Sequence, residues 1–290
     1  MRRSFRDPIK LAKGHSVVRN SSDAKQQKHR PYRSKGRHAR ALSYLALVRA
    51  PTSPSNGLAG KSEILVASYN VHRWAGSNRS RKTDPTRASF VIAEMDADIV
   101  ALQEALRPFA SADPLEQLAE DLGLHLAFVT TRVHRMGEVG NAVLSRWPIT
   151  SVFALDLTHS RVERRSAVAI QCASELGPLS IVATHLSLVD RTRHRQVRSI
   201  LEHPLLQGPV LLMGDMNAWR RCKASRALEK ELVGEDGRWP RTFPAGRPLL
   251  ALDRVYARGA KVVDVAAYSS KIARNASDHL PVKARIKLEW

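Results

Sequence analysis

The chain has 290 residues, of which 43% are hydrophobic and 26% are charged, as in an ordinary soluble globular protein. No stretch approaches the roughly 18 consecutive apolar residues of a transmembrane helix, which excludes a helical membrane span. The formal net charge of +20 is far from neutral and is unevenly distributed along the chain.

The first 60 residues carry most of this charge. They contain 14 basic and 2 acidic residues, for a net charge of +12, whereas residues 61–290 have a net charge of +8. A segment so rich in Arg, Lys, Ser, Gln and Pro cannot bury enough apolar surface to offset its ordering entropy. We therefore predict a basic, disordered tail over residues 1–60, ending in a Pro- and Gly-containing linker, and one folded domain over residues 61–290. The short apolar run at 41–48 follows a basic stretch but ends at Arg49, which makes it weak as an export signal.

Cysteine usage and the N-terminus bear on the compartment. Cys172 and Cys222 lie in no CxxC or Cys/His cluster, which argues against a zinc site and favours two free thiols in a reducing cytoplasm. Arg2-Arg3 resembles the start of a twin-arginine export signal, but charged residues interrupt the apolar stretch that should follow. We expect a cytoplasmic protein, with export left open.

After residue 60, apolar runs typical of strands alternate with amphipathic runs typical of helices. In chain order the sequence predicts a strand at 64–71, a helix from Asp84-Pro85 to Met95, a strand at 99–104, a helix at 115–122, strands at 141–145, 166–172 and 179–186, a helix at 191–201, a strand at 210–213, a helix at 225–233, and strands at 254–256, 262–268 and 282–290. Asp84 followed by Pro85 is a typical helix start. The last segment alternates apolar and charged residues and predicts a half-exposed antiparallel strand. Buried and half-exposed strands with interspersed helices favour an α/β sandwich.

Polar residues recur where these apolar strands stop. They are Asn70, Glu104, Thr184-His185, Asp215-Met216-Asn217, Asp253 and Asp278-His279. Strand ends that share one edge of a sheet converge in space, so we expect these carboxylates, amides and imidazoles to form one site.

The residue types at this site suit phosphoryl chemistry. Carboxylate and amide oxygens bind the hard cations Mg²⁺ or Mn²⁺, which neutralise charge on a phosphate and on its leaving oxygen. A carboxylate can take the proton of an attacking water, and a histidine held by an aspartate can donate to phosphoryl oxygens.

Seven segments in order carry a family resemblance. They are Ser68-Tyr69-Asn70-Val71-His72, Leu102-Gln103-Glu104, Gly140-Asn141-Ala142-Val143-Leu144-Ser145, Thr184-His185-Leu186, Gly214-Asp215-Met216-Asn217, Leu252-Asp253-Arg254-Val255 and Ser277-Asp278-His279-Leu280-Pro281. Each segment alone is weak, but the ordered set resembles the endonuclease/exonuclease/phosphatase superfamily of DNase I-like phosphoesterases. The resemblance covers residues 62–290. It implies a four-layer α/β sandwich, with two mixed β-sheets packed face to face and helices on the outside.

The resemblance also implies residue roles. Catalysis is expected of Asp215, which activates water, together with Asn217, His279, Asp253 and His185; phosphate binding of Asn141 and Arg165; and metal binding of Glu104, Asn70 and Asp278, with Mg²⁺ or Mn²⁺ as the cofactor. Family nucleases often carry an acid where this chain has His72, which puts a second metal site on that side in doubt.

The expected function is metal-dependent hydrolysis of a phosphodiester by a monomeric enzyme. The substrate is either a phospholipid- or glycolipid-type phosphodiester or a nucleic acid, and a possible endonuclease or exonuclease activity stays open. The alternative is a catalytically weak protein that binds nucleic acid or an anionic membrane surface through residues 1–60.

Overall fold

The computed structural model describes residues 46–55, 63–77, 83–160, 163–174, 177–232 and 239–289. Most of the predicted tail, residues 1–45, lies outside the described residues, as do residues 56–62. Within the described part, no helix combines the length and the apolar character needed to cross a membrane.

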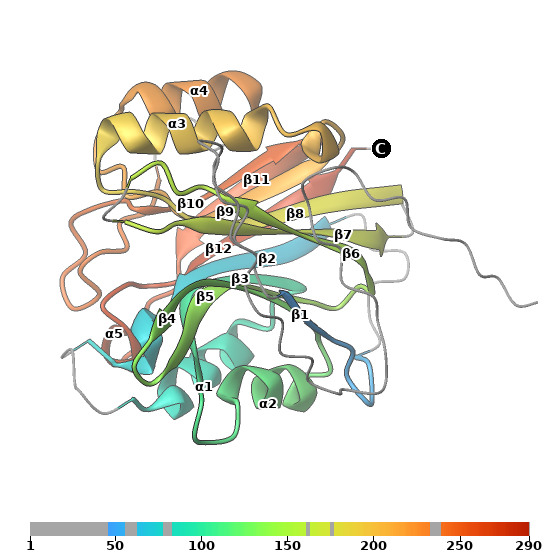
Figure 1. Cartoon of the computed structure of the whole chain (residues 1–290), viewed down its shortest axis with the longest axis vertical. Helices are drawn as coiled ribbons and strands as arrows, with labels where there is room; N and C mark the ends of the chain where they lie inside the picture. Colours follow the sequence, from blue (N-terminus) through green and yellow to red (C-terminus); the bar gives the residue numbers. More distant parts are fainter. Residues whose placement is uncertain are drawn as a thin grey trace, which may run out of the picture.

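Two mixed β-sheets form the centre of the molecule (Figure 1). The seven-stranded sheet has the order β1 (Ala46–Arg49), β4 (His125–His134), β5 (Gly137–Ser145), β3 (Ile99–Pro108), β2 (Glu63–Asn70), β12 (Val282–Leu288) and β11 (Ala260–Ala267). The five-stranded sheet has the order β10 (Asp253–Arg258), β9 (Val210–Asp215), β8 (Gly177–His185), β7 (Ser166–Ser174) and β6 (Ile149–Asp156). The pairs β2–β3 and β8–β9 are parallel, and the other strand pairs are antiparallel.

Helices cover the outer faces of both sheets. The helices are α1 (Pro85–Met95), α2 (Pro114–Asp121), α3 (Asp190–Leu201), α4 (Lys223–Glu231) and α5 (Ala273–Ala276), with 3-10 turns η1 (His72–Trp74) and η2 (Pro204–Leu206). In Figure 1, α3 and α4 lie on the five-stranded sheet, and α1 and α2 lie on the opposite side, against the seven-stranded sheet. This arrangement confirms the predicted four-layer sandwich.

The layers enclose three apolar cores, and β2 shows how one strand serves two of them. Ile64 and Val66 enter the core between the sheets, whereas Ala67 and Tyr69 enter the core beneath α1. Successive side chains of a strand point to opposite faces, so a strand covered on both sides must be apolar throughout. The run at 64–71 is apolar because both faces of β2 are covered.

Local signals for other elements are also confirmed. Asp84 caps α1 by accepting a hydrogen bond from the Thr86 amide, and Pro85 occupies the first helical position. In β12 the apolar residues are buried, and Arg285 and Lys287 are exposed. This strand pairs antiparallel with β2 and β11, as its alternation predicts.

The predicted end of the tail is wrong. Ala46–Arg49 forms the edge strand β1 and pairs antiparallel with β4, from Ala46 opposite Val129 to Arg49 opposite Leu126. Residues 46–48 of the run at 41–48 are therefore part of the sheet, and the domain begins no later than residue 46. A run this short after a basic stretch carries little strand signal of its own, and pairing with β4 stabilises it.

Candidate active site

Three neighbouring strands of the five-stranded sheet place three site residues in one row. His185 at the end of β8 is the register partner of Asp215 at the end of β9, and Asp253 at the start of β10 is the register partner of the same Asp215. All three side chains are buried. The parallel β8–β9 pair and the antiparallel return of β10 thus bring together residues that are far apart in the sequence.

Asn70 ties this row to the other sheet. It ends β2, and its Nδ2 donates a hydrogen bond to Asp215 Oδ2 over 3.1 Å. Its own Oδ1 accepts from the His72 backbone amide at 3.0 Å, and Ser277 Oγ donates to its carbonyl at 2.7 Å. The site therefore lies across the gap between the two sheets, and Asn70 is fixed from both sides.

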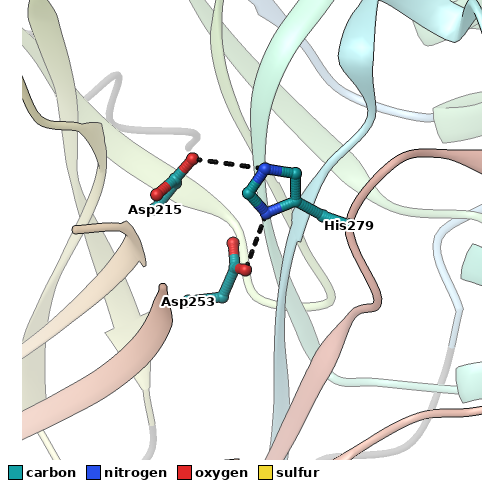
Figure 2. Close-up of side chains that lie close together, drawn as sticks. All are labelled: Asp215, Asp253 and His279. Carbon is teal, nitrogen blue, oxygen red and sulfur yellow. Dashed lines mark hydrogen bonds and ion pairs between the residues drawn. The ribbon is translucent and has the colours of Figure 1, made fainter. Parts of the chain in front are cut away.

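His279 lies between two carboxylates. Its Nδ1 is 2.9 Å from Asp253 Oδ2 and its Nε2 is 3.7 Å from Asp215 Oδ2, as Figure 2 shows. Thr242 Oγ1 also donates to Asp253 Oδ2, at 2.5 Å. Since Thr242 and His279 both direct hydrogen-bond donors at Asp253, that carboxylate is held as an acceptor behind the imidazole.

Burial and the neighbouring charges shift the pKa values of Asp215 and His279. Burial alone would lower the pKa of His279, but the Asp253 and Asp215 carboxylates outweigh burial and raise it to about 10. Burial raises the pKa of Asp215 to about 6, against the opposing effect of the His279 charge. Near neutral pH the group therefore holds an imidazolium beside a carboxylate that takes up a proton readily.

His185 has the opposite charge state. Burial and the neighbouring Arg165 guanidinium hold the pKa of His185 well below its usual range, so its imidazole is neutral. Arg165 Nη1 lies 3.3 Å from His185 Nδ1, and a guanidinium can only donate, so this nitrogen accepts. The ring proton is then on Nε2, which faces Asp215 Oδ2 at 3.3 Å.

Asn217 is held by the turn that follows β9. Its backbone amide donates to Asp215 Oδ1 at 2.9 Å, and its Nδ2 donates to the Leu186 carbonyl at 2.9 Å. Its φ of 49° is in the left-handed region, which is uncommon for a residue other than glycine. Asp215 and Asn217 therefore form one rigid unit.

Glu104 projects from an irregular point in β3. The pairing of β3 with β5 shifts register between Leu102 and Ala105, and Glu104 has a φ of 52°. Such a bulge re-aims a side chain, and strained backbone of this kind clusters at functional sites. The Glu104 carboxylate is 23% exposed, with Arg73 Nε at 3.4 Å and His185 Nδ1 at 3.8 Å.

Most of these side chains line one cleft of about 520 Å³. Of the predicted residues it contains Asn70, Glu104, Arg165, His185, Asp215, Asn217, Asp278 and His279. Asp253 lies behind His279, fully buried. Asn141 does not line the cleft but borders a small adjoining recess, and its Nδ2 donates to the Ser166 carbonyl, linking β5 to β7.

The donor set fits a hard divalent cation. Glu104, Asn70 and Asp278 supply two carboxylates and one amide oxygen from three separate segments to the same cleft. Glu104 lines the cleft and forms an ion pair with Arg73 Nε at 3.4 Å. Asp215, Asp253 and His279 also place ligand atoms within 4.8 Å of one another.

His72 lines the cleft beside Asp278. Arg73 Nη2 lies 3.0 Å from His72 Nε2, so that nitrogen accepts and the ring proton is on Nδ1, 3.4 Å from Asp278 Oδ1. His72 therefore supports Asp278.

Several residues that line the cleft or support its members were not identified from the sequence. The cleft is also lined by Arg73, Arg132, His134 and Arg135. The last three belong to β4 and its turn into β5, and β4 was not predicted, so nothing placed them at a strand end. Thr242, which supports Asp253, lies in a loop and has no sequence signal of its own.

The chain is similar to several known proteins. YbhP of Escherichia coli K12, an uncharacterized protein, is 29% identical over 243 residues, which is 77% of this chain and 96% of YbhP. The endonuclease/exonuclease/phosphatase structure from Beutenbergia cavernae superposes with a TM-score of 0.65 at 25% identity, covering 78% of this chain and 72% of that one. TDP2 of D. rerio in complex with a single-strand DNA product shares the fold, with a TM-score of 0.61 at 14% identity over 78% and 99% of the chains. A family model described as Endonuclease/Exonuclease/phosphatase family matches residues 67–279, and the chain belongs to this family, whose members generally hydrolyse phosphoester bonds.

Proposed function

We propose that this protein is a divalent-metal-dependent phosphodiesterase. The observation that carries the proposal is the buried group of Asp215, Asp253 and His279, which holds a proton acceptor and a charged proton donor side by side in a cleft rich in arginine. Perturbed ionisable groups that converge in a cleft are typical of active sites.

Asp215 is the group that takes the proton of the attacking water. Its pKa of about 6 leaves it ionised near neutral pH and able to accept a proton. Asn217 is fixed to Asp215 through its backbone amide and lines the cleft, so its side chain is placed to orient that water or the phosphate. His185 directs its Nε2 proton at Asp215 and fixes the carboxylate in position.

His279 stabilises the developing negative charge. Its imidazolium is maintained by Asp253 and lines the cleft, so its Nε2 proton can be donated to a phosphoryl oxygen once substrate is bound. Asp253 is a positioning residue, because it holds Nδ1 of the His279 ring and does not itself line the cleft.

Glu104, Asn70 and Asp278 are the residues that would hold Mg²⁺ or Mn²⁺. Three carboxylates, those of Glu104, Asp215 and Asp278, face a cleft that must accept an anion, and a cation offsets their repulsion. When bound, such an ion neutralises charge on the phosphate and on the leaving oxygen.

The first test is hydrolysis of bis-p-nitrophenyl phosphate with Mg²⁺ or Mn²⁺ and in EDTA. We expect metal-dependent turnover, which Glu104→Gln should abolish almost completely while the protein stays folded, because the substitution removes an anionic oxygen ligand. Glu63→Gln is the matched control, since Glu63 is exposed at the opposite end of β2. Turnover that persists in EDTA contradicts the metal requirement, and wild-type kinetics in Glu104→Gln contradict the ligand assignment.

A further inference from the structure

One wall of the cleft carries several arginines beside Glu104 and His185. The end of β4 and its turn into β5 contribute Arg132, His134 and Arg135, and Arg73 from η1 joins them in lining the cleft. We call the three arginines of this set, Arg73, Arg132 and Arg135, the cationic wall. In the part of the chain that the structure describes, none of the three hairpin residues hydrogen bonds or ion pairs with Asp215, Asp253 or His279.

The wall has little compensating negative charge. Arg73 lies 3.4 Å from Glu104, but Arg132 and Arg135 are exposed, and no described carboxylate pairs with either of them. Arg165, by contrast, is already paired with Glu163 at 2.5 Å. The two hairpin arginines are therefore free to bind an anion.

The wall concentrates its charge in a small area. Burial lowers the pKa of His134, and Arg132, Arg73 and Arg135 lower it further. Three arginines close enough to depress one imidazole create a local positive potential in a concave site, which attracts and binds anions. Guanidinium groups also match the geometry of phosphate oxygens.

The cleft has room for a second group beyond the scissile phosphate. Its volume of about 520 Å³ is that of a site for a whole small ligand and far exceeds a single phosphate group. The scissile phosphate is placed by His279, Asp215 and the residues that would hold the metal. The cationic wall then faces the part of the substrate beside it.

We propose that the cationic wall is a second anion subsite, which binds a further phosphate group of the substrate next to the scissile phosphodiester. This inference rests on the proposed phosphodiesterase function and narrows its substrate to molecules with at least two phosphate groups. A nucleic-acid strand and a phosphorylated inositol headgroup both provide this chemistry.

Two chromogenic substrates that differ by one phosphate test the subsite. They are the p-nitrophenyl ester of thymidine 5′-phosphate and the same ester carrying a 3′-phosphate. At about 50 mM salt, wild-type protein should prefer the second substrate by about tenfold in kcat/KM, through a lower KM, since one charge-assisted contact at an exposed site is of this order. Arg132→Ala/Arg135→Ala should reduce the preference to about twofold and leave bis-p-nitrophenyl phosphate hydrolysis unchanged.

The matched control removes the same charge elsewhere. Arg226 on α4 and Arg285 on β12 are exposed and do not line the cleft, so Arg226→Ala/Arg285→Ala should keep the tenfold preference. An equal loss in both double variants would mean that only the overall charge matters and would overturn the subsite.

A binding measurement separates the subsite from the proposed activity. Calorimetry on metal-free protein should give tighter binding of thymidine 3′,5′-bisphosphate than of thymidine 5′-phosphate, and a corresponding preference for glycerophosphoinositol 4-phosphate over glycerophosphoinositol if the headgroup is the source. The larger of the two preferences shows whether a nucleic acid or an inositol headgroup supplies the second phosphate group. Equal binding within both pairs would refute the subsite whether or not the protein hydrolyses anything. Hydrolysis of neither chromogenic substrate, with the binding preference intact, would reject the proposed function alone.

Discussion

The group of Asp215, Asp253 and His279 and the cationic wall lie in and around one cleft, yet they are opposites in burial and pairing. Each member of the first is buried and fixed by neighbours, whereas Arg132 and Arg135 are exposed and have no described carboxylate partner. Buried charges interact strongly because water does not screen them, and exposed charges are weakened by salt. Changes in the buried group should therefore affect kcat, and changes in the wall should affect KM and its salt dependence.

The largest effect is expected from Asp215→Asn, which keeps the size of the side chain but removes the proton acceptor. We expect kcat on bis-p-nitrophenyl phosphate to fall by roughly 10²-fold or more, with KM little changed. Asp264→Asn on exposed β11 is the matched control and should have no effect. A raised KM with intact kcat would show that Asp215 acts in substrate binding. The buried group and the cationic wall would then not differ in the kinetic constant that they affect.

Asp253 and His279 should behave as one unit, because the carboxylate acts only through the imidazole it holds at 2.9 Å. Asp253→Asn and His279→Gln should each lower kcat by roughly 10²-fold, and the double variant should be no worse than the poorer single variant. Steady-state kinetics on all four proteins measures the coupling. Losses that multiply would show that the two residues act independently.

The pH profile of kcat/KM should be a broad bell. Activity requires Asp215 without its proton, so it is lost as pH falls through about 6. It also requires His279 with its proton, so it is lost as pH rises through about 10. In Asp253→Asn the carboxylate that raises the His279 pKa is gone, so the alkaline limb should move to lower pH. An alkaline limb that stays in place would disconnect His279 from Asp253.

The smallest effect is expected from removing residues 1–45, which leaves β1 in place. Hydrolysis of bis-p-nitrophenyl phosphate should be unchanged, because every cleft residue lies after residue 46. Affinity for DNA, RNA or anionic vesicles should fall at about 50 mM salt and much less at about 200 mM, as counterion release predicts. This outcome would support the proposal that the basic N-terminal segment binds polyanions.

That truncation also has two informative failures. Lost activity on the small substrate would mean that the segment belongs to the fold or the site. Unchanged polyanion affinity at low salt would mean that it is an inert extension.

The elements that could be predicted from the sequence are those whose own residues show a strand or helix pattern. The β2 and β9 runs are apolar because they are covered on both faces, and each ends in a polar residue that enters the site. The strands β4 and β6 were missed because polar residues such as Thr130 and Ser151 interrupt their apolar patterns. Cross-strand pairing extends β4 beyond its apolar run at 126–129 into polar and charged positions that carry no strand signal of their own.

The same division applies to the site. Glu104, Asp215 and His279 follow recognisable segments, so their convergence could be expected. The charge states could not, because they depend on distances between distant residues, such as Arg165 beside His185 and Thr242 beside Asp253. The cationic wall was missed for a related reason, since arginines in a hairpin look like any exposed surface until the opposite side of the cleft is known.

The direction of β1 has a consequence for how the whole chain engages a ligand. Ala46 is paired with Val129, and β4 continues from there to Arg132 and His134 at the cleft. Arg132 follows Val129 by three residues, which in a β-strand is a distance of only about 10 Å. Ala46 therefore lies toward the cleft end of β4. A polyanion bound by the residues before Ala46 would be present at a high effective concentration at the cleft. Its contacts with those residues and with the cationic wall would then form one bivalent interaction.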